Sequence, residues 1–228
     1  MRELRFEPGF LDHPDGSCLV CYGKTRVLCT AVVEQGVPRW LGEGAGGWVT
    51  AEYSMLPGSV GQGRKKRERG KPDGRSVEIQ RLIGRSLRAA VRLDLLGPRT
   101  VTCDCDVLQA DGGTRTAAIS GAWVALHGAL ARVAAEAGLA GPGELLRGPL
   151  AAVSVGIVDG EVVCDLDHAA DARAEVDMNV VMLGEEFVEI QGTGEKGTFT
   201  SAQLDALLAA ARQGIRAIRE AQRAALEG

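Results

Sequence analysis

The sequence has no apolar segment that we judge long enough to cross a membrane or to act as a secretory signal. It begins with a charged run, residues 1–5, whereas a signal peptide places an apolar stretch behind its basic start and a membrane helix needs about 20 apolar residues. We therefore expect a cytoplasmic protein with no membrane partner. Because 45% of the 228 residues are apolar, the chain can bury a full core, and we expect one domain over residues 1–228.

Histidine is scarce, and the cysteines do not favour a metal site. The three histidines lie in separate segments, at His13, His127 and His168, so no pairing of a nucleophile with a histidine base is expected. Cys18 and Cys21 have zinc-knuckle spacing, and Cys103 and Cys105 could complete a site. Residues three apart on a strand point to opposite faces, however, so buried reduced thiols are expected instead.

Positive charge is also lacking overall, since the net charge is −4, and at first this argues against a nucleic-acid partner. The charge is unevenly placed. Between residues 64 and 92, eleven Lys or Arg stand against three acidic residues, a net charge of +8, which leaves −12 for the rest. Residues 58–74 have no apolar period and predict a mobile, solvated loop with a function of its own.

Two features near this basic segment fit either an RNA contact or a plain structural role. A helix predicted from Ile79 onward carries a basic stripe, formed by Arg81, Arg85, Arg88 and Arg92, although a solvated helix face explains such a stripe as well. Trp40 and Trp48 can stack on RNA bases, but burial in the core is the commoner outcome and is expected here.

Periodicity divides the chain into two halves of similar plan. In the first half, residues 17–34 predict a β-hairpin, strands are expected over 47–53 and 100–108, and a helix is expected over 116–137. In the second half, strands are expected over 153–158, 161–167, 175–183 and 187–191, and a last helix follows a capping box at Thr200 and Gln203. Strands followed by helix in each half predict an α+β fold of two related halves.

Residues 112–116, with the sequence Gly-Gly-Thr-Arg-Thr, lie between a predicted strand and a predicted helix. Backbone N–H groups at a helix start bind anions, and Arg115 adds a bidentate charged group, so a phosphate site is indicated. This turn has neither the lysine of a Walker A loop nor a dinucleotide fingerprint, so nucleoside triphosphate binding is not expected. A tight turn with an ordinary helix cap explains the five residues equally well.

Five acidic residues crowd into thirteen positions of the second half, namely Asp165, Asp167, Asp171, Glu175 and Asp177. Alternation along the predicted strand puts Glu175, Asp177 and Asn179 on one face. If Asp171 folds back toward Asp177, the two carboxylates form a site of the kind that Mg²⁺ prefers. By pattern alone, a solvated acidic strand edge that prevents aggregation is the more common explanation.

Five stretches spread over nearly the whole chain carry specific motifs. They are GWVTAEYSMLP at 47–57, GRS at 74–76 leading into EIQRLIGR at 78–85, DCDVLQADGGTRT at 104–116, AEVDMN at 174–179 and QGTGE at 191–195. Together they resemble the ribonuclease PH family. The resemblance implies the ribonuclease PH fold, related to one domain of ribosomal protein S5, with antiparallel or mixed sheets and packed helices.

The resemblance also implies an activity, an assembly and a set of site residues. Such a protein is a phosphorolytic 3′ exoribonuclease that trims transfer RNA precursors and other RNA 3′ ends, releases nucleoside diphosphates and forms a homo-hexamer of three dimers. The family's phosphate-binding residues fall on Arg75, Gly113, Thr114 and Arg115. Its catalytic carboxylates, where Mg²⁺ is held, fall on Asp171 and Asp177. The part that contacts transfer RNA falls on Arg64, Lys65, Lys66, Arg67, Arg69 and Lys71.

The chain departs from the family pattern in two places. A segment of about ten residues that usually precedes the Glu3–Phe6 region is not found, and residues 168–170 replace aromatic and acidic residues, which we expect to weaken metal binding. Two other functions are considered: an inert RNA-binding subunit of an exosome-like ring, and a metal-dependent hydrolytic nuclease. The retained aspartates argue against the first and the phosphate turn argues against the second.

Overall fold

Five strands form the first sheet of the computed structural model, which describes residues 1–42, 44, 46–67, 70 and 73–228. They are β1 (Leu4–Pro8), β2 (Gly16–Tyr22), β3 (Thr25–Gln35), β4 (Trp48–Met55) and β5 (Arg99–Gln109). The order is β1-β2-β3-β5-β4, in which only β4 and β5 run parallel. The predicted hairpin is confirmed, because β2 and β3 pair as far as Tyr22 and Thr25.

Four antiparallel strands form the second sheet. They are β6 (Leu150–Val158), β7 (Glu161–Cys164), β8 (Val176–Leu183) and β9 (Glu186–Gly194), in the order β7-β6-β8-β9. Asp159 and Gly160 join β6 to β7 with φ values of 53° and 81°, as a type I′ turn requires. The second predicted hairpin is therefore confirmed, although β7 is shorter than expected.

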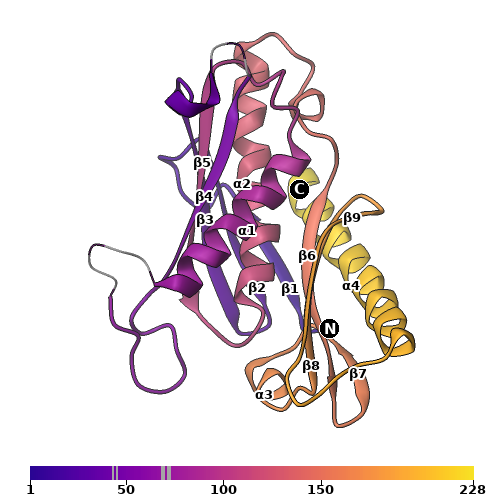
Figure 1. The fold of residues 1–228 in the computed structure, drawn as a ribbon. Helices are drawn as coiled ribbons and strands as arrows, with labels where there is room; N and C mark the ends of the chain where they lie inside the picture. Colours follow the sequence, from indigo (N-terminus) through magenta and orange to yellow (C-terminus); the bar gives the residue numbers. More distant parts are fainter. Residues whose placement is uncertain (43, 45, 68–69, 71–72) are drawn as a thin grey trace.

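The helices and the two sheets stack in layers (Figure 1). Helices α1 (Gly74–Ala90) and α2 (Thr114–Glu136) lie between the sheets, because α1 packs on β4 while α2 contacts β2, β3 and β5 as well as β6. The long helix α4 (Ser201–Glu227) packs on β6 and also contacts β1. The short elements are α3 (His168–Asp171), η1 (Arg39–Leu41) and η2 (Pro142–Glu144). The predicted α+β class is confirmed.

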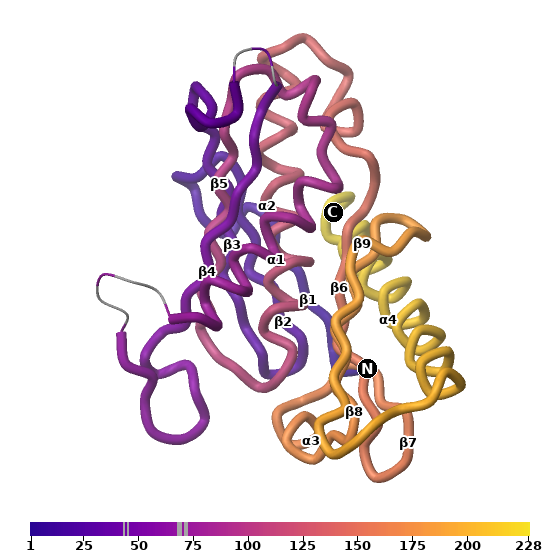
Figure 2. The backbone as a smooth tube through the Cα atoms, viewed as in Figure 1, coloured from indigo at the N-terminus to yellow at the C-terminus, as the bar shows by residue number. Residues whose placement is uncertain are grey.

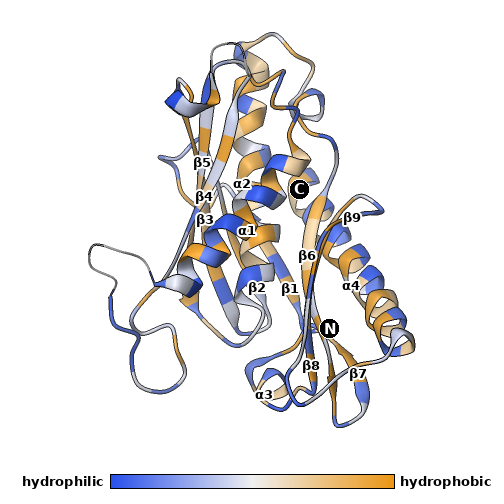
Figure 3. Ribbon diagram, viewed as in Figure 1, coloured by the Kyte–Doolittle hydropathy of each residue, from blue (hydrophilic) through white to orange (hydrophobic). Residues whose placement is uncertain are grey.

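Helix α2 is buried along most of its surface. By length and composition it is able to cross a membrane, so the expectation that no segment has this length is wrong. Its apolar character is used inside the fold, since 78% of the relevant segment is buried. Its buried residues include Ala118, Ile119, Ala122 and Leu126. Figure 3 shows that α4, by contrast, carries both polar and apolar residues, as expected of a helix with one face in solvent.

Other local predictions are also confirmed. The capping box of α4 is present: Gln203 N–H donates to Thr200 Oγ1, and Thr200 N–H donates to Gln203 Oε1. All six cysteines are free and five of them are buried as predicted, whereas Cys164 is partly exposed; burial raises the pKa of Cys18 to about 12. Within the part of the chain that the structure describes, no group of three or more His, Cys, Asp or Glu could hold a metal ion.

Two strand features were not predicted, namely the existence of β1 and the place of β4 in the sheet. Strand β1 has one buried residue, Phe6, and the alternation of apolar Leu4 and Phe6 with charged Arg5 and Glu7 was the available signal for it. Strand β4 lies at the edge of the sheet beyond β5, with α1 as the crossover between these two parallel strands. Position in a sheet depends on long-range pairing, which local periodicity does not encode.

The surface beside β4 also differs from expectation. Trp40 is 68% exposed, so its expected burial is wrong; its ring lies edge-on to Trp48, with centroids 4.8 Å apart. The Arg88 guanidinium lies 4.4 Å from the Trp48 ring centroid and donates to Val49 O over 2.8 Å, which covers the edge of β4. Because α1 ends at Ala90, Arg92 does not continue the basic stripe along the helix.

Substitution of Gly16 tests how closely α2 approaches β2. A methyl group at Gly16 would lie 2.0 Å from Ala125 O and 2.7 Å from Ala129 N, so Gly16→Ala should lower the free energy of unfolding by about 1–3 kcal/mol, as measured by urea denaturation. Gly128→Ala is the matched control, because there a methyl meets only the Gly16 Cα at 3.5 Å. Alanine should then leave stability unchanged or raise it by up to about 1 kcal/mol. Equal losses in the two variants would contradict the close approach.

Candidate active site

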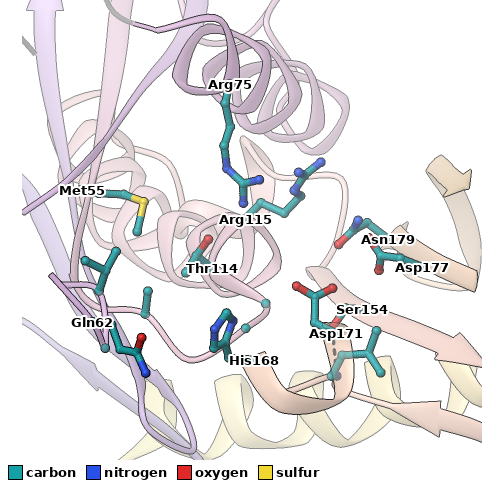
Figure 4. A pocket seen from close by; sticks show the side chains of 16 residues that line it. Met55, Gln62, Arg75, Thr114, Arg115, Ser154, His168, Asp171, Asp177 and Asn179 are labelled. Carbon is teal, nitrogen blue, oxygen red and sulfur yellow. Dashed lines mark hydrogen bonds between the residues drawn. The ribbon is translucent and has the colours of Figure 1, made fainter. Parts of the chain in front are cut away.

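An open cavity of about 670 Å³ lies where segments of both halves meet. Its walls come from the end of β4 and the loop after it, the first turn of α1, the β5–α2 turn, and from β6, α3 and β8. In Figure 4, Arg75 and Arg115 point into the cavity from the starts of α1 and α2. Asp171 faces it from α3, and Asp177 faces it from β8 of the second sheet. The fold therefore brings together two cations and two carboxylates that the sequence keeps far apart.

The β5–α2 turn presents the start of α2 to the cavity. Gly112 and Gly113 have φ values of 78° and 62°, which favour glycine. Thr25 holds the turn on one side, because its Oγ1 donates to Gly112 O over 2.6 Å and accepts from Asp111 N–H over 2.9 Å. Helix α2 begins at Thr114, two residues earlier than predicted. Because the first N–H groups of a helix have no carbonyl partner within it, the start of α2 gives the cavity an anion-binding end.

Arg75 and Arg115 add positive charge beside this helix start. Arg75 lies on the first turn of α1 and is exposed. The Arg115 side chain is only 17% exposed, and it donates to Glu78 Oε1 and to Gln191 Oε1, each over 3.3 Å. Burial raises the pKa of Tyr53, whose hydroxyl donates to Thr114 Oγ1, and the nearby arginines oppose that shift. The two guanidinium groups therefore act on the same small volume.

The structure separates the five clustered acidic residues by role. Asp165 is buried and pairs with Arg2, and Asp167 caps α3 by accepting from Ala170 N–H over 2.8 Å. Glu175 precedes β8 and accepts from Gly160 N–H over 3.1 Å, so the prediction that it shares a strand face with Asp177 is wrong. Asp171 and Asp177 are left to line the cavity.

Asp177 has an environment unlike that of a solvated carboxylate. Burial and the charge of Asp171 raise its pKa to about 6, and Arg115 and Arg75 oppose the shift. Strand β8 is an interior strand of its sheet, so the alternative of an acidic sheet edge fails for this residue. Two close carboxylates with room for water fit Mg²⁺, and in the part of the chain that the structure describes no third carboxylate, His or Cys completes the set.

Several lining residues were not predicted as site residues. Gln62, Ser154, His168 and Asn179 all reach the cavity. The i, i+2 relation to Asp177 was the available signal for Asn179, which lies beside it on β8. Ser154 and His168 had no such signal, because their positions depend on how the second sheet meets the β5–α2 turn.

The structure describes only part of the basic loop, residues 58–74. Figure 2 shows residues 56–67 projecting from the body of the fold, and Val60, Gly61 and Gln62 line the cavity. Arg64, Lys66 and Arg67 are exposed, whereas Lys65 pairs with Asp73 over 3.2 Å. Arg69 and Lys71 lie outside the described residues. The loop therefore lines the cavity with residues 60–62 and carries exposed positive charge in the residues that follow them.

Comparison with known families gives two matches that together cover most of the chain. A sequence model of the 3′ exoribonuclease family, domain 1, matches residues 1–130, and domain 2 of the same family matches residues 148–214. The turn with Gly113 and Arg115 falls in the first match, and both cavity aspartates fall in the second.

Individual proteins show the same relationship. The chain is 56% identical to the ribonuclease PH of Corynebacterium diphtheriae over 100% of its own length and 94% of that protein, and 56% identical to that of Corynebacterium efficiens over 99% and 92%. Among solved structures, rice Rrp46 matches with a TM-score of 0.78 at 17% identity, covering 98% of this chain and 94% of that one. A chain of the Archaeoglobus fulgidus exosome with RNA bound to the active site matches with a TM-score of 0.77 at 22% identity, covering 96% and 87%. At such identities, the structures establish a shared fold.

Inorganic phosphate should bind at the start of α2, and this can be measured without any assay of activity. Phosphate should raise the melting temperature of the wild type, and Arg115→Gln should raise its apparent Kd by about tenfold or more, because a charged hydrogen bond contributes about 1.5–3 kcal/mol. Arg132→Gln is the control, since Arg132 pairs with Asp15 on the surface. An equal response of both variants to phosphate would contradict the site.

Proposed function

The chain belongs to the 3′ exoribonuclease family, and from that premise we propose that it trims transfer RNA precursors by passing their terminal nucleotides to inorganic phosphate. The products are nucleoside diphosphates and an RNA shorter by one nucleotide. One observation carries this proposal: a single cavity holds a helix start with two arginines beside two carboxylates. The curated relatives at 56% identity support the same activity.

The first role of the cavity is to hold a free phosphate for attack. Gly113 and Thr114 offer the helix start, and Arg75 and Arg115 neutralise charge so that the phosphate can approach the equally anionic RNA. An oxygen of the held phosphate forms a bond to the phosphorus of the last phosphodiester, and the bond from that phosphorus to the preceding 3′ oxygen breaks. A phosphoanhydride replaces an ester, so the reaction is readily reversible.

The second role is to accommodate the charge that develops on the leaving 3′ oxygen. Asp171 and Asp177 would hold Mg²⁺, which when bound supplies a Lewis acid. The Asp177 carboxyl can also hold a proton for that oxygen, since its pKa is raised to about 6. Asn179 lies beside Asp177 on β8 and adds a neutral polar group to the same wall.

The surroundings of the cavity extend the proposal to substrate and assembly. We assign the contact with the backbone of transfer RNA to the cations of the basic loop. They are the exposed Arg64, Lys66 and Arg67, the Asp73-paired Lys65, and Arg69 and Lys71. Exosome subunits share this fold, which supports a ring, and we assign a cytoplasmic homo-hexamer of three dimers. Light scattering of the purified protein measures that mass directly.

Omission of phosphate gives the decisive test of the activity. With phosphate, RNA with a free 3′ end should shorten and yield nucleoside diphosphates; without it, shortening should stop, because water does not replace the held nucleophile. Chromatography of the products distinguishes the alternatives. Nucleoside monophosphates formed without phosphate would mean a hydrolytic nuclease, and no product under either condition would mean an inert RNA-binding subunit.

Asp177→Asn should abolish turnover but leave RNA binding, measured by fluorescence anisotropy, within about twofold, because binding depends mainly on the basic loop. If Asp177 holds a cation, kcat/KM of the wild type should fall as the pH drops below about 6, since the protonated carboxyl is a poor cation ligand; if Asp177 donates a proton, kcat/KM should fall as the pH rises above about 6. Raising Mg²⁺ should move this acid limb to lower pH, because the cation binds the ionised form. Glu186→Gln, which replaces an exposed carboxylate of β9, is the control for Asp177→Asn. An acid limb that Mg²⁺ does not move would contradict the metal role.

A further inference from the structure

Arg2 makes an unusually complete set of contacts beneath the cavity. Its backbone N–H and its Nε each donate to Asp165 Oδ2 over 3.0 Å, and its Nη2 donates to Asp165 Oδ1. Its Nη1 donates to the carbonyl oxygen of Asp111. The Arg2 side chain is 16% exposed and the Asp165 side chain is fully buried. One guanidinium therefore joins the first half of the fold to the second.

The two segments that Arg2 joins are both walls of the proposed phosphate site. Asp111 is the residue directly before Gly112 and Gly113, and the Arg2 Nη2 would lie 3.2 Å from a Cβ placed on Gly113. On the other side, Asp165 N–H donates to Ser154 O over 2.7 Å, and Ser154 lines the cavity. The guanidinium thus fills the space behind the turn that faces phosphate.

Such a support is needed because the turn contains two consecutive glycines. Glycine has the largest backbone freedom of any residue, and fixing it costs the most conformational entropy. Thr25 restrains the turn at Gly112 O and Asp111 N, which leaves the Asp111 carbonyl to Arg2. Asp165 in turn is held in a left-handed conformation, with φ 67°, so the Arg2–Asp165 pair fixes an otherwise unfavourable geometry.

We infer that Arg2 is a positioning residue for phosphate: by joining Asp165 to the Asp111 carbonyl it holds the Gly112–Gly113 turn in the conformation that binds the nucleophile. This inference rests on the proposed function. Arg2 does not reach the reacting atoms, so its effect is on the affinity for phosphate rather than on the affinity for RNA. Loss of Arg2 would leave Asp165 as an unpaired buried charge, and loss of Asp165 would leave the Arg2 guanidinium without its carboxylate acceptor.

The test compares steady-state kinetics of the wild type, Arg2→Gln and Arg2→Lys with phosphate and RNA varied separately. Arg2→Gln should raise the KM for phosphate about tenfold to a hundredfold, because a displaced turn weakens charged hydrogen bonds to the phosphate, and the loss of one such bond changes an affinity by about that factor. The KM for RNA should change less than twofold. Arg2→Lys retains the charge but lacks the fork, so it should restore the phosphate KM only in part.

A control and a second variant separate positioning from general stability. Arg219→Gln removes a similar arginine, which donates to Gly184 O and Glu185 Oε1 away from the cavity, and it should leave the phosphate KM unchanged. If Arg2→Gln does not fold, the double variant Arg2→Gln/Asp165→Asn removes the buried charge, and its folded state is checked by circular dichroism.

Phosphate-induced thermal stabilisation gives a readout that does not need activity. The wild type should be stabilised by inorganic phosphate, and the folded Arg2 variants should need about ten times more phosphate for the same shift. If the wild type shows no stabilisation and no phosphorolysis, the proposed function fails. If the wild type binds phosphate and the variants bind it equally well, with only a lower melting temperature, Arg2 is a structural residue and the inference is overturned.

Discussion

The cavity depends on a direct contact between two backbone segments, the β5–α2 turn and the segment that enters α3. A methyl group on Gly112 would lie 2.4 Å from Leu166 O and 2.8 Å from the Asp167 Cα, so only glycine permits this approach. The first segment carries the helix start that binds an anion, and the second leads into Asp171. Neither half of the fold contains the site alone, because it forms only where these two segments touch.

Burial of α2 between the sheets explains why a helix start points into that contact. Apart from its ends the helix is largely apolar and packs against strands of both sheets, so hydrophobic packing fixes its axis. The N–H groups at its start are then directed at one place, where they need an acceptor. The first turn of α1, with Arg75, opens on the same cavity. Core packing therefore determines where positive potential collects, and the charged side chains reinforce it.

Local patterns predicted the features that local physics controls. The two hairpins, the capping box of α4 and the glycine turn follow from turn chemistry and alternation over a few residues. The patterns did not show which clustered carboxylates face the cavity, because Asp165 is neutralised by Arg2, 163 positions away in sequence, and Glu175 is taken by the Gly160 amide. Contacts between residues from different segments therefore determine which carboxylates face the cavity, and periodicity does not encode such contacts.

The opposed charges of the cavity couple its two halves electrostatically. Arg115 and Arg75 lower the pKa of Asp177, yet burial and Asp171 outweigh them, so that the pKa stands raised at about 6. An anion bound at the arginines would cancel part of their field at Asp177 and raise this pKa further. By linkage, protonation of Asp177 must then strengthen phosphate binding by the same factor, and a cation held beside it would strengthen phosphate binding as well. The cavity is therefore arranged so that the nucleophile and the group that stabilises the leaving oxygen favour each other's presence.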